Sequence, residues 1–180
     1  MSEEQFDRLI REHGPALRRL AAAWERDSTA QEDLVQEILF ALWRALPAFR
    51  GDCSERTFVF RVAHNRALTH RFRPRVEGVA LEAAARVEDP APSPEDAVAG
   101  AQKLQRLFRA LQRLPVPARQ VLTLSLEGFE RREIAEVLGI TENNTGVRLM
   151  RARRLLQEEL NDDDERNGLE VDRVSLANGR

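Results

Sequence analysis

The sequence predicts an all-α fold, in which two small helical domains are joined by a flexible linker. Apolar residues recur at spacings of three and four through residues 1–73 and again through 94–160, which is the pattern of helices with one buried face. No segment alternates apolar and polar residues as a strand does, so we expect no sheet. Residues 74–93 are acidic and rich in Pro and Ala, lack an apolar stripe, and form the expected linker.

Four helices are expected in the first domain. The periodicity is interrupted at Gly14-Pro15, at Ser28-Thr29 and between residues 47 and 52, where Gly, Pro and short polar residues favour turns. The helices between these breaks should cover residues 3–12, 15–26, 30–46 and 54–72.

The second domain begins with a strong helix start, in which Ser93 is the cap, Pro94 takes the first position and two acids follow. A break at Pro115 to Pro117 separates this helix from another that ends near Leu126. The polar tail 161–180 contains an acidic cluster and no apolar stripe, so we expect it to be disordered. The buried face of the first of these helices should comprise Leu104, Leu107, Phe108, Leu111 and Leu114.

Residues 131–156 are typical of a helix-turn-helix with a basic second helix. Ile134 and Val137 belong to one buried stripe, Gly139 supplies the positive φ of a tight turn, and Thr141 caps the second helix. The expected buried positions of that helix are Thr145, Leu149, Ala152 and Leu156. Side chains on its other faces can reach base edges and phosphates in a major groove, namely Glu142, Asn143, Asn144, Val147, Arg148, Arg151 and Arg154.

The formal net charge of −2 conceals a segregation of charge along the chain. Eight arginines face two acids between residues 44 and 75, and six arginines face three acids between 131 and 156. The segments 76–99 and 157–180 have the opposite balance, with six acids against one arginine and eight against three. The two basic modules indicate nucleic acid as a partner.

Two further stretches narrow the interpretation: residues 33–44 (DLVQEILFALWR), and Phe49-Arg50-Gly51 followed by residues 57–68 (TFVFRVAHNRAL). They resemble the core-binding helix and the promoter −10 segment of bacterial sigma factors of the extracytoplasmic-function (ECF) type, and the helix-turn-helix resembles the −35 reader of that family. The resemblance implies an alternative sigma factor. Such a protein binds core RNA polymerase, recognises the −35 and −10 elements and promotes DNA opening.

The resemblance implies that the clamp helices of the polymerase β′ subunit meet one face of residues 33–44. Helical spacing places Asp33, Gln36 and Glu37 on that face, where an acidic surface would suit a basic partner. The alternative is that these acids favour the helix N-terminus and remain solvated. The full set of candidates for polymerase binding is Asp33, Gln36, Glu37, Trp43 and Arg44.

Arginines and aromatic residues interleave in the second segment, as they do in proteins that hold single-stranded DNA. The resemblance implies that an extruded base of the −10 element is captured there, in a pocket that includes the loop 49–54. We expect Phe58, Phe60 and Val62 to remain in the core. The candidates for −10 binding are Arg50, Ser54, Arg61, His64, Asn65, Arg66 and Arg71.

Gly146 is unusual within the second basic helix, because Gly in a helix interior costs about 1 kcal/mol relative to Ala. It either permits a close approach of the backbone to DNA or is a tolerated substitution, and the sequence leaves both alternatives open. In many sigma factors of this type a basic residue occupies this position, so the resemblance implies a weaker phosphate grip here.

No cofactor, metal or enzymatic activity is predicted. The three histidines lack a metal-binding spacing, and nucleophile and phosphate-loop motifs are absent. The single Cys53 excludes a disulfide within the chain and is either redox-reactive or incidental. No apolar run approaches the roughly 20 residues of a membrane helix, and no signal peptide pattern begins the sequence, so a cytoplasmic protein is expected.

The partners implied by the resemblance are the polymerase β′ clamp helices and β flap, promoter DNA and an anti-sigma factor. Two alternatives remain from the sequence. One is a free-standing DNA-binding regulator whose first domain dimerises or senses a ligand, and the other is a degenerate relative that only binds protein.

Overall fold

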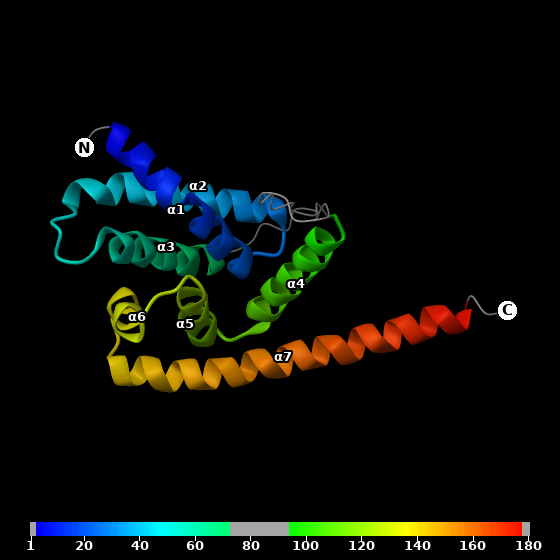
Figure 1. The fold of residues 1–180 in the computed structure, drawn as a ribbon. Coiled ribbons are helices and arrows are strands. Elements are labelled where there is room, and N and C mark those ends of the chain that lie inside the picture. Colours follow the sequence, from blue (N-terminus) through cyan, green and yellow to red (C-terminus); the bar gives the residue numbers. More distant parts are fainter. Residues whose placement is uncertain (1–2, 73–93, 178–180) are drawn as a thin grey trace.

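The computed structural model describes residues 3–72 and 94–177, with side chains at 4–72 and 100–163. Every element in these ranges is helical, which confirms the predicted all-α class. The predicted linker 74–93 lies outside the described residues. In the ribbon view the N-terminal helices form one layer and the C-terminal helices form a second layer against it (Figure 1).

In the first domain, one long helix replaces the first two predicted helices. The break expected at Gly14-Pro15 is wrong, because the helix continues through Pro15. The apolar stripe stays in phase on both sides, and Leu9, Leu17 and Leu20 are all buried. Burying a leucine contributes about 1.5–3 kcal/mol, so three of them offset the roughly 3 kcal/mol that an internal Pro costs. The elements are α1 (Glu3–Trp24), α2 (Ser28–Ala45), a 3-10 turn (Leu46–Ala48) and α3 (Glu55–Arg71).

Side-chain caps fix where the next two helices begin. The Asp27 carboxylate accepts a hydrogen bond from the Ala30 amide at 2.8 Å, at the start of α2. The Ser54 hydroxyl accepts one from the Thr57 amide at 3.0 Å, at the start of α3. Such a cap satisfies an amide that otherwise lacks a partner and contributes about 1 kcal/mol.

The second domain contains four helices within the described residues: α4 (Pro94–Arg113), α5 (Val116–Leu126), α6 (Arg131–Leu138) and α7 (Glu142–Ala177). The first begins at Pro94, as predicted. Leu111 and Leu114 of the predicted stripe are buried, whereas Leu104, Leu107 and Phe108 are partly exposed at the boundary with the first domain.

The prediction of a disordered tail from residue 161 is wrong for most of its length, because α7 runs on to Ala177. The helix is held where the predicted tail begins. Asp163 is buried and pairs with Arg113 of α4, which also lies 3.6 Å from Glu159. The Arg106 guanidinium donates a hydrogen bond to the Leu160 carbonyl oxygen. These contacts between two distant segments are not visible in local sequence polarity.

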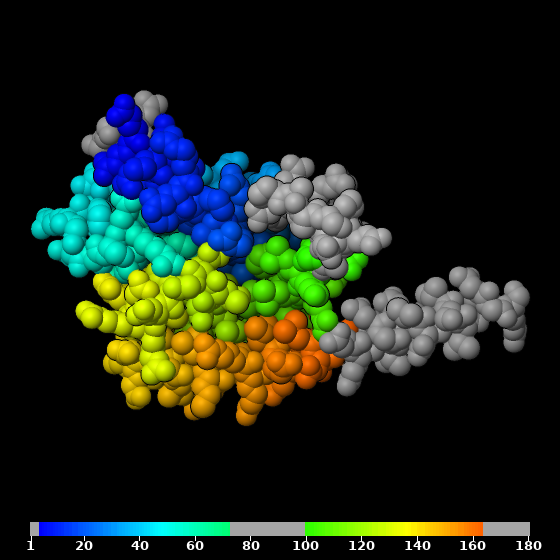
Figure 2. All heavy atoms as spheres, in the orientation of Figure 1, coloured from blue at the N-terminus to red at the C-terminus, as the bar shows by residue number. Residues whose placement is uncertain are grey.

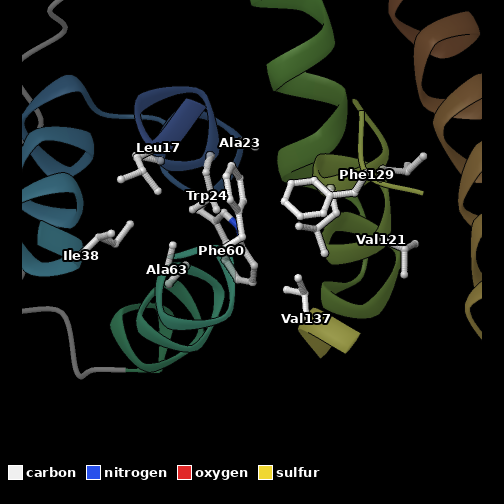
Figure 3. Close-up of a cluster of buried hydrophobic side chains, with 14 of the residues drawn as sticks. Leu17, Ala23, Trp24, Ile38, Phe60, Ala63, Val121, Phe129 and Val137 are labelled. Atoms are coloured by element: carbon white, nitrogen blue, oxygen red, sulfur yellow. The ribbon is translucent and has the colours of Figure 1, made fainter. Parts of the chain in front are cut away.

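The two domains pack directly against each other. Phe60 of α3 and Phe129, between α5 and α6, meet edge to face with ring centroids 4.8 Å apart. Figure 3 shows Trp24 and Phe60 from the first domain facing Phe129 from the second, and in Figure 2 the two halves form one continuous body. The hydrophobic core therefore extends across the domain boundary.

Candidate nucleic-acid interface and adjoining surfaces

The turn between α6 and α7 has the geometry that the sequence predicted. Gly139 adopts φ +65°, and its amide donates to the Ala135 carbonyl oxygen, which closes α6. The Thr141 hydroxyl accepts a hydrogen bond from the Asn144 amide at 3.2 Å and so caps α7. Thr145 is fully buried beneath this turn. The orientation of the second helix is thereby fixed by backbone chemistry as well as by packing.

The first turns of α7 present a polar face to solvent. Buried Leu149 and Ala152 hold the opposite face against the domain. Arg148 is half-buried, and its Nε donates to the Asn144 carboxamide oxygen at 3.1 Å, so these two side chains orient each other. The Arg154 guanidinium lies 3.4 Å from Glu158. The structure exposes Glu142, Asn143, Asn144, Val147, Arg151 and Arg154 on one stretch of helix.

Gly146 leaves room for Arg131 of α6. A Cβ atom added at Gly146 would lie 3.4 Å from the Arg131 guanidinium carbon, within contact distance. The space left by the missing side chain is therefore filled by the Arg131 guanidinium. Because that partner is the far end of a flexible side chain, a methyl group could be accommodated by a small shift.

The surface of α3 keeps some of the predicted −10 candidates exposed. Asn65, Arg50 and Arg71 are exposed. Ser54 is exposed as a residue, but its hydroxyl caps α3 and also donates to the Thr57 hydroxyl at 2.8 Å.

His64 is not an exposed DNA-binding candidate: the residue is only 1% exposed. Its ring packs edge to face with Trp24, at a centroid distance of 6.4 Å. Burial lowers the pKa of His64 to about 3, so the ring is neutral at physiological pH. The prediction failed because His64 lies between Phe60 and Ala67 on the stripe that faces α1 and the second domain.

Arg61 and Arg66, two further −10 candidates, are engaged within the protein. Arg61 donates to the Glu136 carbonyl oxygen of α6 at 3.1 Å, across the domain boundary. Arg66 donates through Nε to Glu37 of α2 at 2.9 Å. These contacts within the protein limit how far either guanidinium can reach toward DNA.

The exposed face of α2 combines acidic and apolar side chains. Asp33 and Gln36 are exposed, as predicted. Trp43 is 44% exposed, and its ring packs edge to face with Phe6 at 5.1 Å. Nearby Phe40 is 62% exposed, with the Arg44 guanidinium over its ring at 5.9 Å. A surface with two large exposed aromatic side chains is typical of a protein-binding site.

Glu37 is less exposed than predicted for a polymerase-binding residue of that face. Its side chain is 21% exposed, it accepts a hydrogen bond from Arg66 Nε, and its Oε2 atom lies 3.2 Å from His70 Nδ1. Glu37 therefore joins α2 to α3. Helical spacing gave the position of Glu37 on α2, but could not show that Arg66 of α3 forms an ion pair with it.

The sequence did not point to the residues that join the domains. Arg119 of α5 is fully buried, stacks over Trp24 at 5.2 Å and donates to the Leu114 carbonyl oxygen at 3.1 Å. Burial, with the nearby Arg71 charge, lowers its pKa to about 10. The Gln112 side-chain amide donates to the carbonyl oxygens of Ala22 and Glu25 at the end of α1. In the sequence, the feature that could have indicated this boundary is a polar residue among apolar ones, at Gln112 and at Arg119.

A cavity of about 190 Å³ lies between the domains. It is lined on one side by Leu20, Phe60 and His64 and on the other by Leu107 and Phe108 of α4. Because Leu104, Leu107 and Phe108 of α4 line this cavity, these members of the predicted stripe are only partly buried.

Within the described residues, no helix combines the length and the hydrophobicity needed to cross a bilayer.

A two-domain helical DNA-binding protein is the class that this fold and these exposed faces define. Residues 9–77 match the family model of Sigma-70 region 2, and residues 104–156 match that of Sigma-70 region 4. The RNA polymerase sigma factor CnrH of Cupriavidus metallidurans is 32% identical over 175 residues, which cover 92% of this chain and 91% of that protein. The ECF sigma factor SigM of Mycobacterium tuberculosis is 31% identical, covering 84% and 74%.

Solved structures agree. The chain is similar to CnrH in complex with the cytosolic domain of CnrY, with a TM-score of 0.65, 26% identity and coverage of 90% and 91%. It is also similar to RpoE in complex with the anti-sigma factor NepR from Bartonella quintana, with a TM-score of 0.66, 26% identity and coverage of 88% and 98%. The chain belongs to the RNA polymerase sigma factors of the ECF type.

Proposed function

We propose that this sigma factor binds core RNA polymerase through the exposed face of α2 and directs initiation by reading the two promoter elements with its two domains. The β′ clamp helices are the partner of Asp33, Gln36, Trp43 and Arg44, and the β flap is a partner of the second domain. Initiation takes place in the cytoplasm. The observation that carries this proposal is the basic, polar face at the start of α7, which directly follows a capped turn. The same chain exposes the aromatic side chains of α2.

The −35 element is the duplex target of α7. Asn143 and Asn144 suit adenine, and Arg148 and Arg151 suit guanine or phosphate. The −10 element is the target of α3 and the preceding loop, where Asn65, Arg50 and Arg71 are accessible.

In the packed arrangement, one proposed DNA-binding side chain of the first domain is engaged with the second domain. Arg61, proposed to contact the −10 strand, is bound to Glu136 beside the helix-turn-helix. Separation of the domains at this contact would free Arg61 for promoter DNA. An anti-sigma factor is the partner that would hold the domains in a non-productive arrangement. This proposal is supported by the similar structure of RpoE, which is a complex with the anti-sigma factor NepR.

Run-off transcription with core polymerase and promoters selected from genomic fragments tests the proposal. Added protein should start transcripts at defined sites. Trp43→Ala should weaken binding to core polymerase, whereas Phe72→Ala, an exposed aromatic variant at the end of α3, should not. A free-standing regulator would fail to bind core polymerase stoichiometrically in a pull-down, and that result together with no initiation would refute the function.

A further inference from the structure

Three potential metal ligands converge where α1 passes the start of α3. Glu12 and His13 are consecutive in α1, and Glu55 is the first residue of α3. One ligand atom from each side chain lies within 4.8 Å of the other two. The His13 Nε2 atom is 3.9 Å from Glu12 Oε1 and 4.0 Å from Glu55 Oε1.

His13 is more than nine-tenths buried, with 7% of the residue exposed. Its Nε2 atom is buried and has no hydrogen-bond partner in the described structure. Leaving such an atom unsatisfied destabilises the fold. A buried ring nitrogen without a hydrogen-bond partner is available to bind a metal ion.

Arg8 orients the two carboxylates without occupying the atoms that face His13. Its guanidinium donates to Glu12 Oε2 at 3.3 Å and to Glu55 Oε2 at 2.6 Å. The other oxygen of each carboxylate, Oε1, is the one that faces the imidazole. An outer group that orients the ligating carboxylates in this way is a common feature of metal sites.

We infer that Glu12, His13 and Glu55 form a binding site for a divalent first-row transition-metal ion such as Zn²⁺. One nitrogen and two carboxylate oxygens form a mixed donor set that suits this class better than Ca²⁺, which takes six to eight oxygens. Three protein ligands leave at least one coordination position for water.

The distances require a small adjustment. Ligand bonds of about 2.0–2.2 Å at a tetrahedral angle place ligand atoms about 3.4 Å apart. The present separations of 3.9 and 4.0 Å are therefore about 0.5 Å too long. Glu12 has the freedom to close one of them, because its side chain is 57% exposed. The nearby positive charges of Arg8 and Arg56 offset part of the carboxylate charge, which favours moderate affinity.

A bound ion would tie α1 to the start of α3, next to the Ser54 cap and the loop 49–54. Because the ion binds the native geometry and not the separated ligands of the unfolded chain, it stabilises the fold by mass action. The site adjoins the loop 49–54 proposed for the −10 element, so its test measures metal binding and stability and does not use transcription.

Isothermal titration of the full chain with Zn²⁺, after chelator treatment and removal of any histidine tag, tests the inference. We expect one site per chain, an affinity at least tenfold weaker in Glu12→Gln and in Glu55→Gln, and a Zn²⁺-dependent rise in melting temperature that both variants lose. Glu12→Gln is the main variant, because Glu12 is exposed and its substitution should leave the circular dichroism spectrum unchanged.

Matched control variants test whether the ion binds at these three residues. Glu32→Gln, an exposed acid of α2, and His70→Gln should bind Zn²⁺ as the unchanged protein does. Cys53→Ser should do so as well, because the thiol is not among the three ligands. The inference is overturned if the unchanged protein does not bind Zn²⁺, if Glu12→Gln and Glu55→Gln bind it equally well, or if Cys53→Ser abolishes binding.

Discussion

Arg19 of α1 and Glu127, the residue after α5, form a two-pronged ion pair across the domain boundary, with Nε–Oε1 at 2.8 Å and Nη2–Oε2 at 2.7 Å. The Glu127 carbonyl oxygen also accepts a hydrogen bond from Arg56 of α3, whose guanidinium lies 3.9 Å from the centre of the Phe129 ring. One short segment of the second domain is thus held by two helices of the first. The contact between Arg61 and Glu136 lies across the same domain boundary.

Arg19→Ala should loosen the packing of the domains. Because the Arg19 side chain is 44% exposed, we expect the pair to contribute at most about 1 kcal/mol, or about a fivefold change in the ratio of packed to separated domains. Small-angle scattering should show a larger radius of gyration. Arg18→Ala, at the adjacent exposed position, is the control, and an equal expansion in both variants would contradict the assignment.

Asp33→Lys and Glu37→Lys should have different effects, although both reverse a charge on α2. Asp33 is exposed, so its variant should fold normally and lose affinity for core polymerase. The Glu37 variant would place a cation against Arg66 and His70, and should lower the free energy of unfolding by about 1–3 kcal/mol. Urea denaturation and polymerase pull-down separate the two. Equal stability of both variants would show that the Glu37 network is unimportant.

Arg151→Ala should weaken initiation at promoters that depend on their −35 sequence. Loss of a base contact corresponds to about 1–3 kcal/mol of discrimination between cognate and altered −35 elements. Run-off transcription on matched promoter pairs measures it. Arg154→Ala is a useful comparison, since Arg154 lies near Glu158 and farther from the capped end of α7. A uniform loss on all promoters after Arg151→Ala would indicate a phosphate contact instead.

His64→Phe should make the protein less sensitive to acid. The native ring stays neutral down to a pKa of about 3, whereas the unfolded chain takes up a proton near pH 6.5. The unfolded state therefore binds more protons between these values, and stability falls as the pH is lowered through them, by up to about 1.4 kcal/mol per pH unit. Urea titrations between pH 4.5 and 7 should show a shallower slope in the variant. A smaller slope should remain from His13, whose pKa burial also lowers; an unchanged slope would exclude His64 as its source.

Gly146→Ala should stabilise the second domain by about 0.5–1 kcal/mol, because Ala is the better helix former and the new methyl group meets only the end of the Arg131 side chain. Thermal denaturation measures the gain. If −35-dependent initiation also falls, the glycine serves the approach of DNA; if it is unchanged, its role is confined to the packing of Arg131. A destabilised variant would contradict both the propensity and the packing argument.

The sequence by itself determined the all-α class and the turn that presents the proposed −35 face. Positive φ at Gly139, the Thr141 cap and the buried Thr145, Leu149 and Ala152 follow from residue chemistry within a few positions, so they could be predicted. The resemblance to ECF sigma factors also rested on local stretches, and the matches to Sigma-70 regions 2 and 4 confirm it.

The tertiary structure decided what each polar side chain does. Glu37 has a helical position compatible with exposure, but Arg66 of α3 pairs with it, and His64 lies on a stripe that Trp24 of α1 covers. The proposed metal site joins Glu12 and His13 to Glu55, more than forty residues away, a separation with no recognisable spacing. Local sequence fixes backbone conformation through short-range sterics and hydrogen bonds, whereas burial and ion pairing depend on which helices meet, and that is set by the packing of the whole chain.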